Sequence, residues 1–212
     1  MEWLKATLEP IRSNRRAYRA INLAYYGLIL VTMAVTAALP GVRDGLLASV
    51  RESLASGGLS PIAEIYGSRS LLPIVAVTLA ANLFVGSLAT ITFPSAIVPF
   101  SGLALGGVRA AAWGVLFSPD LSGLTAAKIG AGAFIAGLLF LEGQGYVLAM
   151  LAAWLQGRAV LRPDRVGASS LWPAYRRSLG ITLCIYVWVV LVLLVAAVYE
   201  AAGTIWILPA LG

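Results

Sequence analysis

The chain has 212 residues, of which 60% are hydrophobic and only 11% are charged, and its mean hydropathy is +0.89. Soluble domains carry about a quarter charged residues, so this composition excludes a soluble enzyme. The sequence has no histidine and a single cysteine, Cys184, so we expect no metal site, no cofactor, no His-based catalytic triad and no intramolecular disulfide. The net charge of +6 does not indicate nucleic acid, because the basic residues flank apolar runs.

The first apolar run extends from about Ala20 to Leu39 and ends at Pro40. A helix that crosses a bilayer needs roughly 20 apolar residues, and a signal peptide has a shorter apolar region of about 7 to 15. We therefore interpret the run as an uncleaved anchor. Residues 1–19 have an excess of basic side chains, which predicts that they form a cytoplasmic basic segment. The basic residues are Lys5, Arg12, Arg15, Arg16 and Arg19, opposed by Glu2 and Glu9.

Residues 41–70 are the longest polar interlude, and their acidic and basic side chains balance, so nothing holds this loop in the cytoplasm. Leu47, Val50 and Leu54 recur at helical spacing, which predicts a short amphipathic helix that ends before Gly57. Two interpretations remain open: the helix packs at the interface against its own bundle, or it is a docking surface for an extracytoplasmic partner.

The second span is expected from Leu71 to Phe93, where Pro94 stops the helix and a tight turn follows. A third span is expected from about Ala96 to Phe117. It contains Arg109, an unusual residue for a helix that faces lipid.

The fourth apolar region runs from about Leu124 to Gln156, which is longer than one crossing needs. The sequence Glu142-Gly143-Gln144-Gly145 interrupts it, so we expect this helix to be kinked or broken. Residues 157–178 carry five arginines against Asp164, which predicts a cytoplasmic basic loop. The last span is expected from about Leu179 to Val198.

These spans predict an all-α fold: a polytopic membrane helix bundle of five transmembrane helices, forming a single domain over residues 1–212 with a cytoplasmic amino terminus. Five crossings place both strongly basic segments, residues 1–19 and 157–178, on the cytoplasmic side. Six crossings, with the fourth region split at Glu142, would place the second basic segment outside.

Arg109, Lys128 and Glu142 lie within or near apolar runs, where an ionisable side chain needs a partner or water. Lys128 is close enough to a helix end to extend to the headgroups. Arg109 and Glu142 are expected to form an ion pair between adjacent spans, brought together by a kink at residues 143–145. The pair is interpreted either as a contact that fixes the register of two helices or as a polar pocket for an ion, a proton or a lipid headgroup.

Asn82 and Gln144 are candidates for hydrogen bonds between helices, and Gly157 closes the half-helix that follows Glu142. Small residues spaced by four occur in the third and fourth spans, which predicts that these two spans form a tightly packed hairpin. They are Gly102 and Gly106 in the third span and Ala133 and Gly137 in the fourth.

No catalytic residue is assigned. A Ser-Lys dyad of Lys128 with Ser118 or Ser122 is conceivable, but neither serine lies in a recognisable motif.

The order of these features resembles the stage II sporulation protein M family of integral membrane proteins. The matching positions are Asn82, the run from Ser101 to Gly106, the run from Glu142 to Tyr146, and Gly157. Relatives usually have Asn-Gly at Ser101-Gly102 and a His-Gly pair before the glutamate aligned with Glu142. The resemblance implies a five-span, non-enzymatic membrane assembly protein, since the family member of spore-forming bacteria is a scaffold that helps to localise cell-wall hydrolases.

The leading functional hypothesis is therefore a non-enzymatic scaffold in a prokaryotic cell membrane, which binds other membrane or cell-envelope proteins, with a homo-oligomer left open. For this scaffold we expect the lipid bilayer and other proteins as partners, and we expect no nucleic acid. The alternative hypothesis is a small transporter or permease subunit with a polar intramembrane pocket at Arg109 and Glu142.

Overall fold

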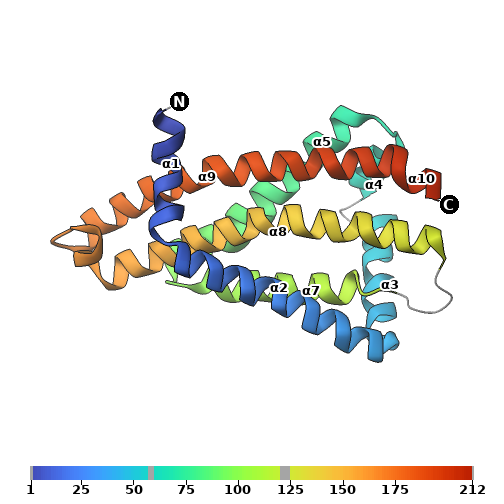
Figure 1. Cartoon of the computed structure of the whole chain (residues 1–212), viewed down its shortest axis with the longest axis horizontal. Coiled ribbons are helices and arrows are strands. Elements are labelled where there is room, and N and C mark those ends of the chain that lie inside the picture. Colours follow the sequence, from blue (N-terminus) through green and yellow to red (C-terminus); the bar gives the residue numbers. More distant parts are fainter. Residues whose placement is uncertain (1, 57–59, 120–124, 212) are drawn as a thin grey trace.

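A computed structural model describes residues 2–56, 60–119 and 125–211, and within these ranges the chain forms helices and no strand. The helices lie roughly along one long axis, apart from α1 (Glu2–Ser13) and α3 (Pro40–Ser56), which cross it (Figure 1). The connection between α8 and α9 lies at one end of the molecule, and α3 and the carboxyl terminus lie towards the other end (Figure 1).

Four helical stretches are long and apolar enough to cross a membrane, which indicates a multi-pass membrane protein. They are α2 (Arg15–Ala38), the stretch Leu71–Ile97, α8 (Ala126–Leu161) and the stretch Leu171–Ala210. The second stretch joins α5 (Leu71–Ala80), the π-helix η1 (Ala81–Thr92) and α6 (Phe93–Ile97). The fourth joins α9 (Leu171–Ala202), the π-helix η3 (Gly203–Ile207) and α10 (Leu208–Leu211).

The expected third span is shorter than the sequence suggested. Its helix, α7 (Ser101–Leu116), has 16 residues and a length of about 24 Å, against a hydrocarbon core of about 30 Å. The helix begins late because Pro99 restricts the residue before it, and Val98 is accordingly extended with φ −116° and ψ 107°. Phe100 then adopts a left-handed conformation with φ 68°, which turns the chain into α7.

Pro94 does not end the second helix, contrary to our expectation. The helix continues to Ile97, and the turn falls at residues 98–100. Pro94 lies in the first turn of α6, immediately after the π-helix, where the hydrogen-bonding register changes. A proline is tolerated in a first helical turn because its missing N–H would have no helical partner there.

The expected break in the fourth span is also absent, since α8 is an unbroken helix of 36 residues through Glu142 and Gly145. The two glycines of this stretch serve close packing instead. A Cβ at Gly143 would lie 2.6 Å from the Tyr26 hydroxyl, and a Cβ at Gly145 would lie 2.5 Å from a methyl group of Leu193. Helices α2 and α9 therefore approach α8 at these two positions.

Three of the other predicted packing glycines approach side chains of other elements closely, and only one of them does so between α7 and α8. Gly106 contacts Met150 of α8, and Gly157 contacts Phe100. Gly137, however, faces the Tyr199 hydroxyl of α9, and Ala133 is exposed, so neither joins α7 in a hairpin seam. The spacing of small residues predicted close packing between α7 and α8. Only the contact of Gly106 with Met150 agrees with that prediction.

The two polar segments are largely helical. The predicted amphipathic helix corresponds to α3, which ends at Ser56, although the side chains of Val50 and Leu54 lie outside the described residues. It is followed by α4 (Ser60–Gly67). The predicted basic loop 157–178 is reduced to residues 162–170, which include the 3-10 helix η2 (Pro163–Val166), because α8 and α9 extend further than expected. Arg177 closes this turn by donating to the carbonyls of Val166 and Gly167.

Helix α8 is the centre of the bundle. Its residues from Tyr146 to Ala153 are all buried, and α2, η1, α7 and α9 contact it. A helix that is buried on every side fits the absence of a clear polar face in this stretch of sequence.

Gly102→Ala tests this packing. The new methyl group would overlap the carbonyl oxygen of Ile91, which belongs to the backbone and cannot rotate away. We expect a loss of about 1–3 kcal/mol in the free energy of unfolding, measured by reversible denaturation in detergent. Gly132→Ala in α8 is the matched control, since a Cβ there meets no atom within 4 Å. Equal stability of the two variants would contradict this packing.

Candidate functional site

A relay of hydrogen bonds connects Arg109 to Glu142 through two intervening side chains. The Arg109 guanidinium donates to the Tyr146 hydroxyl over 2.6 Å, and that hydroxyl donates to the side-chain oxygen of Asn82 over 2.7 Å. The Asn82 amide nitrogen then donates to a carboxylate oxygen of Glu142 over 2.7 Å. We call these four residues the relay. It joins α7, α8 and η1 in the interior of the bundle.

A second acidic side chain meets the far end of the relay. Glu200 of α9 lies beside Glu142 of α8, with the two carboxyl groups within reach of a hydrogen bond. Two ionised carboxylates have no proton to donate, so a hydrogen bond between them would need one proton on the pair. The Tyr66 hydroxyl of α4 donates to Glu200 over 2.7 Å and lies 2.6 Å from the Thr78 hydroxyl of α5. We call Glu142 and Glu200 the acid pair.

One proton on the acid pair would balance the buried charge. Arg109 carries one positive charge, and an acid pair with one proton carries one negative charge. An uncompensated charge at bilayer depth costs about 2.5–3.5 kcal/mol on insertion scales, so the neutral combination is strongly favoured. Glu142, Asn82 and Tyr146 are all buried, which keeps water from screening these charges.

The π-helix η1 positions Asn82. In this register the Ser87 hydroxyl donates to the carbonyl of Asn82, five residues earlier, over 3.0 Å. Gly86 lies on the same segment, where a Cβ would meet the Tyr146 ring at 2.8 Å, so glycine is needed for the ring to reach Asn82. π-Helical turns occur often at functional sites, and here one places an amide between two helices.

Aromatic rings hold the Arg109 guanidinium in place. Its carbon lies 4.2 Å from the centroid of the Tyr146 ring and 4.9 Å from that of the Trp113 ring. Such cation–π contacts stabilise a desolvated guanidinium by about 2 kcal/mol or more. The charge therefore stays inside the bundle without an adjacent carboxylate.

The expected direct ion pair of Arg109 and Glu142 is thus replaced by the relay, and no kink is needed to bring the two together. Both residues belong to the network, but Asn82 and Tyr146 separate them. The physical reason is that an amide and a phenol can each accept one hydrogen bond and donate another, and so bridge a gap that two side chains alone do not close.

Gln144 belongs to a separate cluster on the face of α8 that meets α2. Its amide nitrogen donates to Asn22 over 2.8 Å and to the Tyr26 hydroxyl over 2.9 Å, and its oxygen accepts from the Tyr18 hydroxyl over 2.6 Å. The prediction that Gln144 bridges helices is confirmed, but it shares no hydrogen-bond partner with Asn82.

Lys128 lies apart from the relay, exposed in the first turn of α8, where its backbone N–H donates to the Thr125 hydroxyl over 3.2 Å. Of the two serines considered as its catalytic partners, Ser118 donates its hydroxyl proton to the Met33 carbonyl over 3.0 Å. Ser122 lies outside the described residues. The polar groups of Lys128 and of the relay therefore do not form one site.

Sequence reasoning missed Glu200, Tyr146 and Tyr66. Glu200 looked like a residue beyond the last span, although the apolar sequence continues to Ala210, and this continuation was the available signal. Tyr146 belongs to the run that carries the family resemblance, but its side chain has no charge at neutral pH, so the sequence did not predict a polar contact for it. Tyr66 reaches the site from α4, and sequence spacing contains no information about that contact.

Comparison with known proteins gives no relative: the chain matches no family model, no curated protein and no solved structure.

A double-mutant cycle tests the relay. Asn82→Leu removes the acceptor of the Tyr146 hydroxyl and a donor to Glu142, so it should destabilise the protein by about 1–3 kcal/mol, as measured by denaturation in detergent. Combined with Tyr146→Phe, the loss should be smaller than the sum of the two single losses by at least about 0.5 kcal/mol.

Gln144→Leu provides the control pair. It removes hydrogen bonds to α2 that Asn82 does not share, so its effect should add to that of Asn82→Leu within about 0.5 kcal/mol. Additivity of Asn82→Leu with Tyr146→Phe would contradict the relay.

Proposed function

We propose that this protein is a small carrier of a prokaryotic cell membrane that exchanges protons for a small monovalent cation at the acid pair. The observation that carries the proposal is the close approach of Glu142 and Glu200, two carboxyl groups from different helices of an apolar bundle. Ionisable residues within spans are costly, and they mark proton relays and ion pathways in many pumps and transporters.

Charge balance favours exchange of one cation for one proton. A monovalent cation that replaces the shared proton leaves the net charge of the acid pair and Arg109 unchanged. The groups around this position are oxygen donors, namely two carboxylates and the hydroxyls of Tyr66 and Thr78, and hard cations take oxygen ligands. Either occupant therefore satisfies the same electrostatic requirement.

Tyr66 is the proposed cover of the acid pair. It belongs to α4, between the first and second candidate spans, so its helix can move without unpacking the bundle. Burial is the main cause that raises the pKa of its hydroxyl, and Glu200 beside it acts in the same direction. The hydroxyl therefore remains a neutral donor to Glu200 while it covers the site.

The proposed topology has five crossings, with α7 as the short third one and the amino terminus in the cytoplasm. The direction of the chain along the bundle supports it, since α7 connects the turn at residues 98–100 with the loop at the opposite end (Figure 1). The basic residues before α2 and those near the α8–α9 connection then both face the cytoplasm, as the positive-inside rule requires.

Transport is tested in liposomes that contain the purified protein and a trapped pH-sensitive dye. With an acidic interior, external Li⁺, Na⁺ or K⁺ should raise the internal pH faster than in protein-free liposomes. Glu142→Gln and Glu200→Gln keep the shape of the side chain but abolish the site, so each should reduce the rate to that of empty liposomes.

The control is Gln144→Leu, which changes a partly buried polar residue close to Glu142 in sequence but outside the network of the acid pair. It should retain the wild-type rate. The proposal fails if none of the three cations accelerates the change of pH, or if the two Glu variants are as fast as the wild type while Gln144→Leu is slow.

A scaffold function is the second candidate. It rests on the resemblance to the stage II sporulation protein M family at Asn82, Gly102, Gly106, Glu142 and Gly157, and in this case the relay serves to fix helix register. Partners would be other membrane or cell-envelope proteins, or further copies of the chain. Glu142→Gln would then leave the proteins that co-purify with the chain unchanged, provided that the variant folds.

A further inference from the structure

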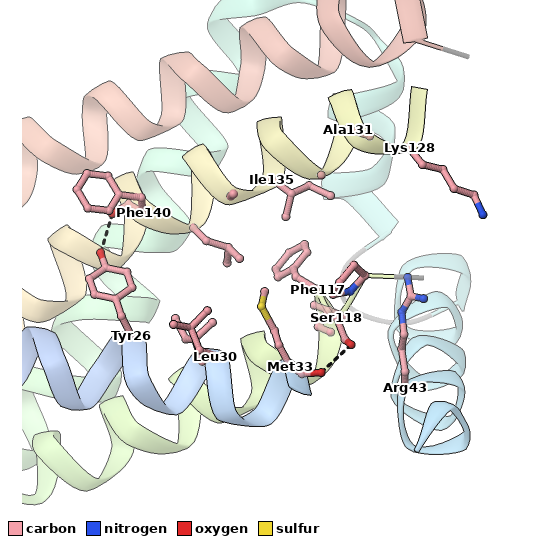
Figure 2. A pocket seen from close by; sticks show the side chains of 16 residues that line it. Tyr26, Leu30, Met33, Arg43, Phe117, Ser118, Lys128, Ala131, Ile135 and Phe140 are labelled. Carbon is pink, nitrogen blue, oxygen red and sulfur yellow. Dashed lines mark hydrogen bonds between the residues drawn. The ribbon is translucent and has the colours of Figure 1, made fainter. Parts of the chain in front are cut away.

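An apolar groove on the bundle has two cations at its mouth. It has a volume of about 820 Å³ and lies between α2 and α8, away from the relay. Leu30 and Met33 of α2 line one wall, and Ile135 of α8 lines the other (Figure 2). Arg43 of α3 and Lys128 of α8 lie together at one end (Figure 2).

Tyr26 and Phe140 lie at the end of the groove that is far from the two cations (Figure 2). The Tyr26 hydroxyl donates to the Phe140 carbonyl over 2.8 Å, and the two rings stack with centroids 5.9 Å apart. From Lys128 to Phe140 the groove follows 12 residues of helix, or about 18 Å, which is comparable to the hydrocarbon depth of one leaflet, about 15 Å. The dimensions therefore suit a hydrocarbon chain that starts at the cations and ends at the stacked rings.

The groove faces the surroundings of the bundle, since Leu30 is 65% exposed and Phe140 is 58% exposed. In a membrane this surface contacts lipid, so the buried guanidinium nitrogen at the mouth needs an explanation. None of the described lining residues is acidic, and the buried Nε of Arg43 has no hydrogen-bond partner within the described ranges. An anion at the mouth would provide that partner.

We infer that this groove is a binding site for an anionic phospholipid, with the phosphate between Arg43 and Lys128 and an acyl chain along α2 and α8. The pattern of one charged end and one long apolar end matches such a lipid better than a protein helix, which would need an apolar contact along its whole length. Guanidinium and ammonium groups both bind phosphate, and each basic residue near a membrane surface contributes about 1 kcal/mol towards anionic lipid, or about fivefold in affinity.

Native mass spectrometry tests the headgroup. The protein is purified from nanodiscs that contain equal amounts of phosphatidylglycerol and phosphatidylcholine with identical acyl chains. The wild type should retain phosphatidylglycerol in preference to phosphatidylcholine, and Arg43→Gln and Lys128→Gln should each lower that preference about fivefold. Arg69→Gln removes the same charge from an exposed residue outside the groove and should leave the preference unchanged.

A second variant tests the acyl chain. Gly132 lines the groove and a Cβ there meets no atom within 4 Å, so the side chain of Gly132→Leu occupies the cavity without disturbing its walls. This variant should lose the retained lipid. Gly180→Leu is the control, because Gly180 lies in open space on α9, outside the groove.

Three results would overturn the inference. The first is equal retention of both lipids by the wild type, and the second is an unchanged preference after removal of both Arg43 and Lys128. The third is a protein dimer that Gly132→Leu dissociates, which would assign the groove to a second copy of the chain. All three leave the acid pair untouched, so they do not bear on cation exchange.

Discussion

Electroneutrality of a buried polar network is the constraint on which the rest of this structure depends. Arg109 cannot leave the bundle, because two aromatic rings hold its guanidinium, and so its charge must be balanced inside. In the proposed carrier, the acid pair balances this charge when Glu142 and Glu200 share one proton or one other monovalent cation. A network that is neutral only when it is occupied would favour exchange of its occupant over an empty site.

The packing of the helices serves this network. Gly86 lets the Tyr146 ring approach η1, and the π-helical register places Asn82 between Tyr146 and Glu142. Gly145 brings α9 close to α8, one turn from Glu142. Glycines that look like helix breakers in the sequence are therefore sites of close approach, which is their usual role where membrane helices pack.

The sequence predicted the helical class and a helix after the first span, and it singled out Asn82, Arg109 and Glu142 as polar residues within apolar helices, because apolar length and misplaced polar residues are local signals. It did not predict the partners. Tyr146 is uncharged, Glu200 lies near a helix end, and Tyr66 comes from a connecting helix, so only tertiary contacts reveal them. Pro94 and Gly143 led to wrong predictions of helix ends, because proline and glycine often break helices in water. Here the change from π-helix to α-helix accommodates Pro94, and Gly143 packs against Tyr26.

Isotope-edited infrared spectroscopy of the carboxyl groups tests the central claim most directly. At neutral pH the wild type should show a protonated glutamate, and both Glu142→Gln and Glu200→Gln should lose it, because the single remaining carboxylate then balances Arg109. Arg109→Gln should instead increase the protonated signal, since the acid pair then has no cation to balance. A wild type without a protonated glutamate, or Glu variants that keep the signal, would contradict the account.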